Sequence, residues 1–258
     1  MPINLGYEDA GTGVAVVLIH AFPLSRAMFA AQVAGLADRA RIVAPDLRGL
    51  GTSPGPGEDQ PSIDTMADDV AALLDRLDLG PAVVAGVSMG GYVAMAMLRR
   101  HPDRVGGVVL MDTKASADDA PARENRERVA AAVLDNGPRA LRPMLDGLLG
   151  QTTRSDRPEV VETVTRWLDA ARPDGVAWAQ RAMAGRPDSF GTLAAARVPA
   201  FVVVGEEDTL TTHDDALAMA AAFARPAPVH VIPRAGHLSA VENPDEVTGA
   251  LRDVLRHF

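Results

Sequence analysis

A serine flanked by two glycines stands where an apolar run of the chain changes into a helix-forming run. The segment Gly86–Gly90, Gly-Val-Ser-Met-Gly, follows the β-type run 82–85 and precedes the helical run 92–98. A strand that turns directly into a helix leaves no room for side chains on either side of the turn, and glycine fits both places. The turn pushes Ser88 out of the packed layers and places it at a helix N-terminus, which favours a negative charge beside the hydroxyl. This environment suits a catalytic nucleophile.

The alternative is a serine that only caps the following helix, because a G-x-S-x-G string also occurs by chance. The strand before the motif, the helix after it and a third glycine at 91 favour the nucleophile.

Short β-rich runs alternate with helical patterns, which is typical of a parallel sheet with helices on both faces. Strands are expected at 14–19, 41–44, 82–85, 105–111, 200–204 and 229–232. Helices are expected at 27–36, 63–77, 89–100, 213–223 and 244–256, and Pro244 suits a first helical turn. We therefore predict an α/β fold with a mostly parallel central sheet.

The alternation stops after Met111, and no further strand is expected before Ala200. The intervening segment is helical in pattern, and turn signals divide it. Its expected helices are 125–134, 139–149, 159–171 and 176–184. We predict a core domain made of residues 1–112 and 191–258, with residues 113–190 as a helical insertion.

Composition removes several classes of function. The chain has no cysteine, which excludes disulfides, thiolate metal sites and cysteine nucleophiles. Its net charge is −9, with 12 basic and 12 acidic residues in 113–190 against 13 basic and 22 acidic residues elsewhere. No basic stripe is present to neutralise phosphates, so we expect no nucleic-acid partner.

The sequence also lacks motifs for binding a metal or a cofactor and signals for secretion or membrane insertion. No spacing of metal ligands and no glycine-rich phosphate fingerprint occurs, since Gly11-Thr12-Gly13 is a plain turn signal, and we expect no metal and no cofactor. The first residues lack a basic region followed by an apolar stretch, and no apolar run approaches ~18 residues. We expect a cytoplasmic protein that does not enter a membrane. The sequence leaves open whether the protein forms a homo-oligomer.

An activated serine needs a base and a group that orients the base. Among six histidines, His237 is best placed, after Gly236 in a loop that follows the last strand, whereas His20 ends a strand among residues that suggest another role. Asp208 follows the strand 200–204 and lies at the carboxyl edge of the sheet, where open parallel sheets gather functional groups. Asp112 meets the same criterion after the strand 105–111 and is its main rival.

The chain order Ser88, Asp208, His237 is the order expected when a nucleophile elbow supplies the serine. With these residues, the chain resembles the α/β-hydrolase superfamily over nearly its whole length. The segments that carry the resemblance are 20–23, 46–53, 86–91, 205–208 and 236–237. Within the superfamily, the segments 86–91, 110–113 and 186–189 are similar to the 3-oxoadipate enol-lactonase-like branch, with cofactor-free haloperoxidases and small esterases as neighbours.

The resemblance implies an oxyanion hole made by the backbone N–H groups of Phe22 and Met89, with the Phe22 ring lining the substrate pocket. Ala21 stands where the family more often has glycine, and its methyl group is expected to narrow the acyl side of the site. Asp46 and Arg48 are interpreted as a structural ion pair.

The resemblance also implies that the helical insertion is a cap over Ser88 whose side chains select the substrate. Trp178 is a candidate pocket residue, and Trp167 is better explained by helix packing. Five arginines of the insertion are candidates for binding a substrate carboxylate: Arg123, Arg126, Arg128, Arg181 and Arg186.

We therefore expect a serine hydrolase that cleaves a small carboxylic ester or lactone through an acyl-enzyme, with Ser88, His237 and Asp208 as its catalytic residues. Two alternatives stay open: perhydrolysis of the cofactor-free haloperoxidase type, and a ligand-binding sensory protein that keeps the triad but turns over slowly.

Overall fold

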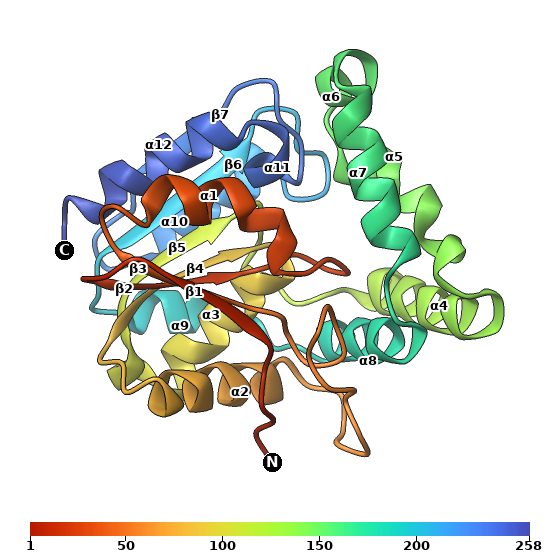
Figure 1. The fold of residues 1–258 in the computed structure, drawn as a ribbon, viewed down its shortest axis with the longest axis horizontal. Helices are drawn as coiled ribbons and strands as arrows, with labels where there is room; N and C mark the ends of the chain where they lie inside the picture. Colours follow the sequence, from red (N-terminus) through yellow and green to blue (C-terminus); the bar gives the residue numbers. More distant parts are fainter.

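Seven strands form one sheet in the computed structural model, which describes residues 1–258 (Figure 1). The strands are β1 Tyr7–Ala10, β2 Ala15–Ile19, β3 Arg41–Pro45, β4 Ala82–Val87, β5 Val105–Met111, β6 Ala200–Gly205 and β7 Val229–Ile232. Their order is β1-β3-β2-β4-β5-β6-β7, and every neighbouring pair is parallel except β1 and β3. The mostly parallel sheet expected from the sequence is confirmed.

The central strands are covered on both faces. Every residue of β2 and β4 is buried, as expected for apolar runs with no polar alternation. β4 lies between β2 and β5, so Ser88 directly follows the middle strand of the sheet. The carboxyl ends of β2, β5 and β6 lie on the same edge, which brings the loops that follow these strands close to Ser88.

The edge strand β1 was not expected from the sequence. It pairs with β3 in the antiparallel direction, with Tyr7 opposite Pro45. Three of its four residues are exposed, so β1 lacks the apolar run by which the other strands are recognised.

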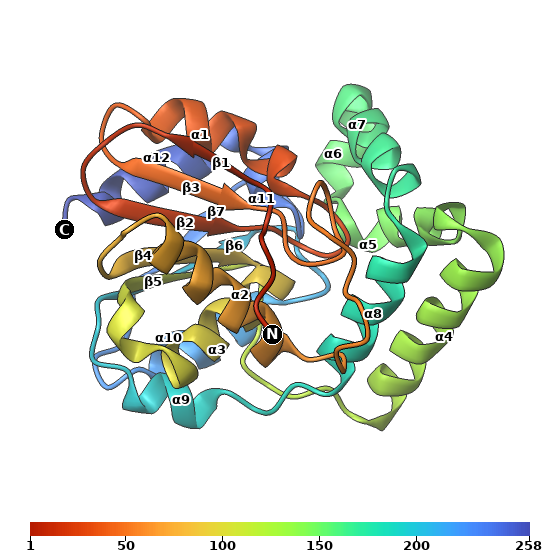
Figure 2. The ribbon, with the colours of Figure 1, turned by 60° about the horizontal axis from the view of Figure 1, so that its bottom comes forward.

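Helices cover both faces of this sheet. One face carries α1 Ala30–Leu36 and α12 Pro244–Leu255, with the short α11 Ser239–Glu242 beside them; the other carries α2 Ile63–Arg76, α3 Met89–Arg100, α9 Phe190–Ala195 and α10 His213–Ala222 (Figure 2). Short 3₁₀ segments are η1 Arg26–Phe29 and η2 Pro102–Arg104. Helix α3 is buried from Met89 to Leu98, because it lies between the sheet and helices α2 and α9.

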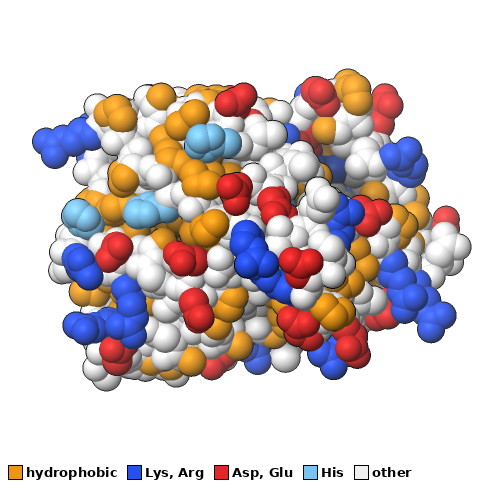
Figure 3. All heavy atoms as spheres, turned by 90° about the horizontal axis from the view of Figure 1, so that it is seen from above, with side chains coloured by type: hydrophobic (Ala, Val, Ile, Leu, Met, Phe, Trp, Pro, Cys, Tyr) orange, Lys and Arg blue, Asp and Glu red, His pale blue; other side chains and the backbone are white.

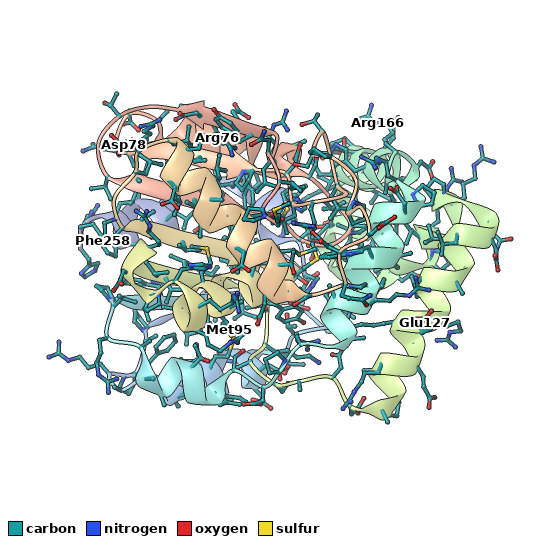
Figure 4. The ribbon with its side chains drawn as sticks, turned by 90° about the horizontal axis from the view of Figure 1, so that it is seen from below. Arg76, Asp78, Met95, Glu127, Arg166 and Phe258 are labelled. Atoms are coloured by element: carbon teal, nitrogen blue, oxygen red, sulfur yellow. The ribbon has the colours of Figure 1, made fainter.

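The segment between β5 and α9 forms a separate group of helices at one end of the sheet (Figure 1). It contains α4 Ala120–Asn136, η3 Pro138–Met144, α5 Leu145–Leu148, α6 Gln151–Asp156, α7 Pro158–Asp169 and α8 Pro173–Ala184. Helices α4 and α8 pack together, and Glu127 of α4, labelled in Figure 4, accepts hydrogen bonds from Arg181 of α8. The division into a core and an insertion with a boundary at 190 stays a prediction.

Three helices of this segment differ from the sequence expectation, and one of them, α6, was not expected at all. The helix expected at 139–149 is a 3₁₀ segment followed by the one-turn helix α5, because Pro143 has no N–H with which to continue an α-helical ladder. Helix α4 begins earlier than expected, where the side chain of Asp119 accepts the N–H of Ala122 and caps the first turn.

The expected ion pair between Asp46 and Arg48 is wrong. Asp46 binds Arg26 and accepts the N–H and hydroxyl of Thr52. Arg48 donates two hydrogen bonds to Asp69 on α2, at 2.6 and 2.8 Å, and both side chains are fully buried. The sequence shows the charged residues of this loop but not which helix packs on it.

Charged groups are mixed on the face in Figure 3, where basic and acidic side chains are interspersed rather than gathered into one stripe. None of the helices combines the length and the apolar character that crossing a membrane requires.

The buried pair of Arg48 and Asp69 generates a stability prediction. Arg48→Met leaves the Asp69 carboxylate buried without its partner and is expected to lower the free energy of unfolding by about 3–5 kcal/mol, measured by urea denaturation. The matched control is Arg41→Met, which breaks the partly exposed pair with Asp9 and should cost less than about 1 kcal/mol. Equal losses in the two variants would contradict the prediction.

Candidate active site

The turn at Ser88 is built by close backbone packing. Ser88 has φ 54° and ψ −112°, outside the regions that L-residues usually adopt. A Cβ on Gly86 would lie 2.2 Å from the carbonyl of Gly90, and a Cβ on Gly90 would lie 2.0 Å from the carbonyl oxygen of Ile19. The hydroxyl of Thr113 donates to the carbonyl of Ser88 at 2.8 Å and holds the turn from the side. The expected need for glycine at 86 and 90 is confirmed.

The structure brings Ser88, His237 and Asp208 into one chain of hydrogen bonds. The Ser88 hydroxyl lies 2.8 Å from His237 Nε2, and His237 Nδ1 lies 2.8 Å from Asp208 Oδ2. These residues follow β4, β7 and β6, so three strand ends supply the three groups. With Nδ1–H donating to Asp208, Nε2 is free to accept the serine proton.

Asp208 is held in an ionised state by donors from its own loop. The N–H groups of Leu210 and Thr211 donate to Oδ1, and the Thr211 hydroxyl donates to Oδ2 at 2.6 Å. Burial alone would raise the pKa of Asp208, but the hydrogen bonds from His237 and Thr211 lower it below its usual value. Thr211 was not identified from the sequence, since a threonine three residues after an aspartate is common in turns.

The pKa of His237 depends on the carboxylates that surround its ring. Burial alone would lower the pKa of its imidazole, but the hydrogen bond and charge of Asp208, together with the charges of Asp112 and Glu242, raise the pKa above 6.5. A protonated imidazole is therefore stabilised in this site.

Asp112, the rival carboxylate, forms no hydrogen bond with the His237 ring. Its Oδ1 accepts the N–H of Gly205, and its Oδ2 accepts the N–H and the hydroxyl of Ser239. Burial, with the nearby charge of Asp208, raises the pKa of Asp112 to about 7. Asp112 therefore joins the end of β6 to the segment that follows His237.

The loop after β2 carries the expected oxyanion donor Phe22. The Nδ1–H of the buried His20 donates to the carbonyl of Ala21, and His20 Nε2 accepts the N–H of Leu47. Burial lowers the pKa of His20, so its ring stays neutral and holds this loop. The N–H groups of Phe22 and Met89 donate to no other group of the protein, as expected of groups that bind a ligand oxygen.

The loop that carries His237 is held by a carboxylate that the sequence did not reveal. The buried Glu242 accepts the N–H of Gly236 at 3.0 Å and of Leu238 at 3.1 Å, the residues on either side of His237. It also accepts the N–H of Gly150, just before α6, at 2.8 Å. No motif marks Glu242, because the two segments that it joins are far apart in the chain.

Gly236 is required by close packing and not by its backbone conformation. Its φ is not positive; instead, a Cβ there would lie 2.3 Å from the N atom of Gly150. Glycine is therefore required because the insertion packs directly on the backbone beside His237.

A cavity of about 260 Å³ lies between the strand ends and the insertion, with Ser88 and His237 on its wall. The insertion contributes most of its apolar wall. The remaining lining residues are Phe22, Tyr92, Lys114, Asp118, Ala122, Asn125, Arg126, Val129, Met144, Leu148, Gln180, Met183, Leu210 and Thr211. Phe22 lies in the pocket, as expected.

The expectation that Trp178 lines the pocket is wrong. Its indole N–H donates to the carbonyl of Asp59 at 2.8 Å, and the guanidinium of Arg48 lies 5.5 Å from its ring centroid. Trp178 thus attaches α8 to the loop before α2, while Gln180 and Met183, further along α8, line the cavity.

Of the five candidate arginines, only Arg126 lines the cavity. Arg128 and Arg181 bind side chains of the insertion, Arg123 donates to the carbonyl of Asp118, and Arg186 is buried. No group of three or more His, Asp or Glu side chains has an arrangement suited to a metal ion.

Comparisons with known proteins agree with the fold described above. The model of a family described by the alpha/beta hydrolase fold matches residues 14–244. The chain is 28% identical over 264 residues to 3-oxoadipate enol-lactonase 2 of Acinetobacter baylyi, covering 99% of this chain and 94% of the relative. Among solved structures, a thermophilic esterase from Thermogutta terrifontis with malate bound is similar, with a TM-score of 0.95, 42% identity and coverage of 99% of this chain and 94% of that chain.

A bromoperoxidase from Bacillus anthracis is also similar, with a TM-score of 0.86, 25% identity and coverage of 99% and 96%. One fold is thus shared by relatives that are named for different activities, and the family alone does not determine the substrate.

The two carboxylates near His237 are expected to differ in their effect on ester hydrolysis. Asp208→Asn should lower kcat by about 10³–10⁴-fold, because the imidazole loses the partner that fixes its tautomer and stabilises its charge. Asp112→Asn should lower it by less than about tenfold, since Asp112 holds backbone and not the ring. Steady-state kinetics on a p-nitrophenyl ester measure both, and the opposite ranking would assign the wrong carboxylate to His237.

The raised pKa of His237 predicts the acidic limb of activity. His237 accepts a proton only when neutral, so kcat/KM should fall as pH falls through its pKa, with a midpoint above 6.5. The pKa of Asp112, about 7, lies in the same range, so Asp112 carries its negative charge in the upper part of this limb. Asp112→Asn removes that charge, and the midpoint should move to lower pH. The exposed variant Asp103→Asn should leave the midpoint in place; an unmoved midpoint in Asp112→Asn would contradict the assigned coupling.

Proposed function

The chain belongs to the α/β-hydrolase family and is a hydrolase of that fold, and we propose that it is a serine hydrolase that cleaves a small carboxylic ester or lactone through an acyl-enzyme. The observation that carries the proposal is the unbroken path of hydrogen bonds from the Ser88 hydroxyl through His237 to Asp208 on the wall of the cavity.

In the first half of the proposed reaction, the Ser88 oxygen attacks the substrate carbonyl carbon while His237 Nε2 takes the serine proton. Asp208 stabilises the imidazolium. The carbonyl oxygen becomes an oxyanion that accepts the free N–H groups of Phe22 and Met89, and loss of one such donor typically costs on the order of 10²–10³ in turnover. When the bond from carbon to the leaving oxygen breaks, His237 returns the proton to that oxygen.

In the second half, His237 takes a proton from water, whose oxygen attacks the acyl-enzyme. The acid product leaves, and the proton returns to Ser88. In this scheme the helices α4, α5 and α8 form the cap that limits the acyl group, since their side chains line the cavity opposite Ser88. The cytoplasmic location and the lack of nucleic-acid and membrane partners stay predictions from the sequence.

The cavity volume supports a small substrate. At about 260 Å³ it lies below the roughly 300–1,000 Å³ typical of pockets for drug-sized ligands. Acetyl and butyryl esters are therefore favoured over long-chain esters.

The test is hydrolysis of p-nitrophenyl acetate, butyrate and octanoate by the purified chain. We expect turnover of the two short esters, slower turnover of the octanoate, and a loss of at least about 10³-fold in Ser88→Ala. The matched control is Ser155→Ala, which changes an exposed serine of α6 and should retain activity. Retained activity in Ser88→Ala would refute the serine mechanism.

Ester hydrolysis, together with a halogenation assay, separates the two alternative functions. Binding of esters with negligible turnover would favour a sensory protein. Halogenation that requires both peroxide and a carboxylic acid, and that exceeds ester hydrolysis, would favour a perhydrolase; the similarity to the bromoperoxidase motivates this arm.

A further inference from the structure

We propose that the segment 150–157 of the insertion, which contains α6, holds the loops of Asp208 and His237 in position relative to each other. Arg157 and Glu207 are the positioning residues. The inference rests on the proposed function, because it concerns the acid and the base of the same reaction. Neither positioning side chain lines the cavity, so both act through the loops that they hold.

The segment 150–157 reaches the histidine loop through the guanidinium of Arg157. Its Nη1 donates to the carbonyl of Arg234 at 3.1 Å and to the carbonyl of Glu242 at 2.6 Å. These two carbonyls lie before and after His237 in the chain, so one guanidinium joins both ends of the loop. Hydrogen bonds from a charged donor are stronger than those between neutral groups, which suits this role.

The histidine loop needs such support at Arg234. This residue has φ 55°, in the left-handed region that residues with a side chain seldom adopt. Its N–H donates to the Glu206 carboxylate at 3.0 Å and its carbonyl accepts Arg157, so its backbone is held from both sides. A strained residue keeps its conformation only where its surroundings fix it. Loss of the Arg157 guanidinium therefore frees the residue from which the chain turns toward His237.

The same segment holds the other loop through Glu207, which directly precedes Asp208. The N–H of Thr152 donates to Glu207 Oε2 at 2.8 Å, and the Thr152 hydroxyl donates to Oε1. The N–H of Glu207 donates to the carbonyl of Ala235 at 2.8 Å, two residues before His237. Glu207 thus binds the insertion with its side chain and the histidine loop with its backbone.

The backbone of Gly150 packs directly on both loops. A Cβ there would lie 2.5 Å from Glu207 Oε2 and 2.8 Å from the N atom of Gly236. A displacement of the segment is therefore passed to both loops. Asp208 and His237 meet at one hydrogen bond of 2.8 Å, which a small relative shift of the loops weakens. A misplacement of about 1 Å in an active site can cost on the order of 10²-fold in rate.

The first test measures hydrolysis of p-nitrophenyl butyrate by Arg157→Met and Glu207→Met. Each change keeps most of the length of the side chain and removes its hydrogen bonds. We expect kcat to fall by about tenfold or more, and KM to change by less than about threefold, because neither residue lines the cavity. Rates are expressed per active site, counted with a fluorophosphonate that labels Ser88, so that a loss of folded protein does not lower kcat.

Conservative variants and a matched control accompany this measurement. Arg157→Lys keeps a charged donor for the loop carbonyls, and Glu207→Gln keeps an acceptor for the Thr152 N–H; both should retain most of the wild-type kcat. The control is Arg154→Met on the same helix, because the exposed Arg154 binds only Asp146 of the insertion. This variant should keep the wild-type kcat.

A spectroscopic measurement tests the positioning without relying on turnover. In the chain labelled with ¹⁵N-histidine, the Nδ1 proton that His237 donates to Asp208 is expected to give a far-downfield NMR signal, assigned by its absence in His237→Gln. In Arg157→Met and Glu207→Met the signal should weaken or move upfield, because the hydrogen bond is less well held. In Arg154→Met it should stay in place.

Wild-type kcat per active site with an unchanged Nδ1 signal in both methionine variants would overturn the inference and leave the proposed function intact, even if those variants were less stable. Absence of ester hydrolysis by the wild-type chain would instead count against the proposed function, and the Nδ1 signal would then decide the inference by itself. If neither methionine variant folds, Thr152→Val supplies the decision, since it removes only the hydroxyl that binds Glu207. Its kcat should fall by at least about threefold, and a wild-type value would overturn the inference.

Discussion

The active site depends on how closely the nucleophile turn packs on the end of β2. The α-carbon of Gly90 lies so near the carbonyls of Ile19 and His20 that no side chain fits between them. This contact fixes the N-terminus of α3 against the loop that carries Phe22. The serine hydroxyl and the two unpaired backbone N–H groups are thus positioned by the sheet itself, before any substrate is bound.

Three carboxylates, those of Asp112, Asp208 and Glu242, are buried near the imidazole of His237. None of them forms an ion pair with Arg or Lys. Backbone N–H groups and hydroxyls satisfy them instead, and each carboxylate thereby fixes a different stretch of backbone. The negative charges favour a protonated imidazole, and the hydrogen bonds keep its loop in place.

The sequence predicted those features that depend on short stretches of chain. Strands β2 to β6 contain buried apolar runs, and Ser88, Asp208 and His237 follow strand ends that a parallel sheet brings to one edge. Features that depend on distant segments could not be predicted. Trp178 attaches a helix instead of lining the pocket because the loop before α2 packs on it, and Arg48 pairs with Asp69 because α2 lies beside its loop. The edge strand β1 was not predicted, because it has no apolar run and is recognised only by its pairing with β3.

Because one carboxylate, Glu242, holds both the histidine loop and the residue before α6, these two parts of the molecule share an anchor. A change at Gly150 would therefore reach the imidazole through backbone contacts and not through the cavity. Helix α8, by contrast, is attached to the core by the Trp178 indole, whose N–H donates to the carbonyl of Asp59. The insertion is thus joined to the core at two separate places, one beside the histidine loop and one at the loop before α2.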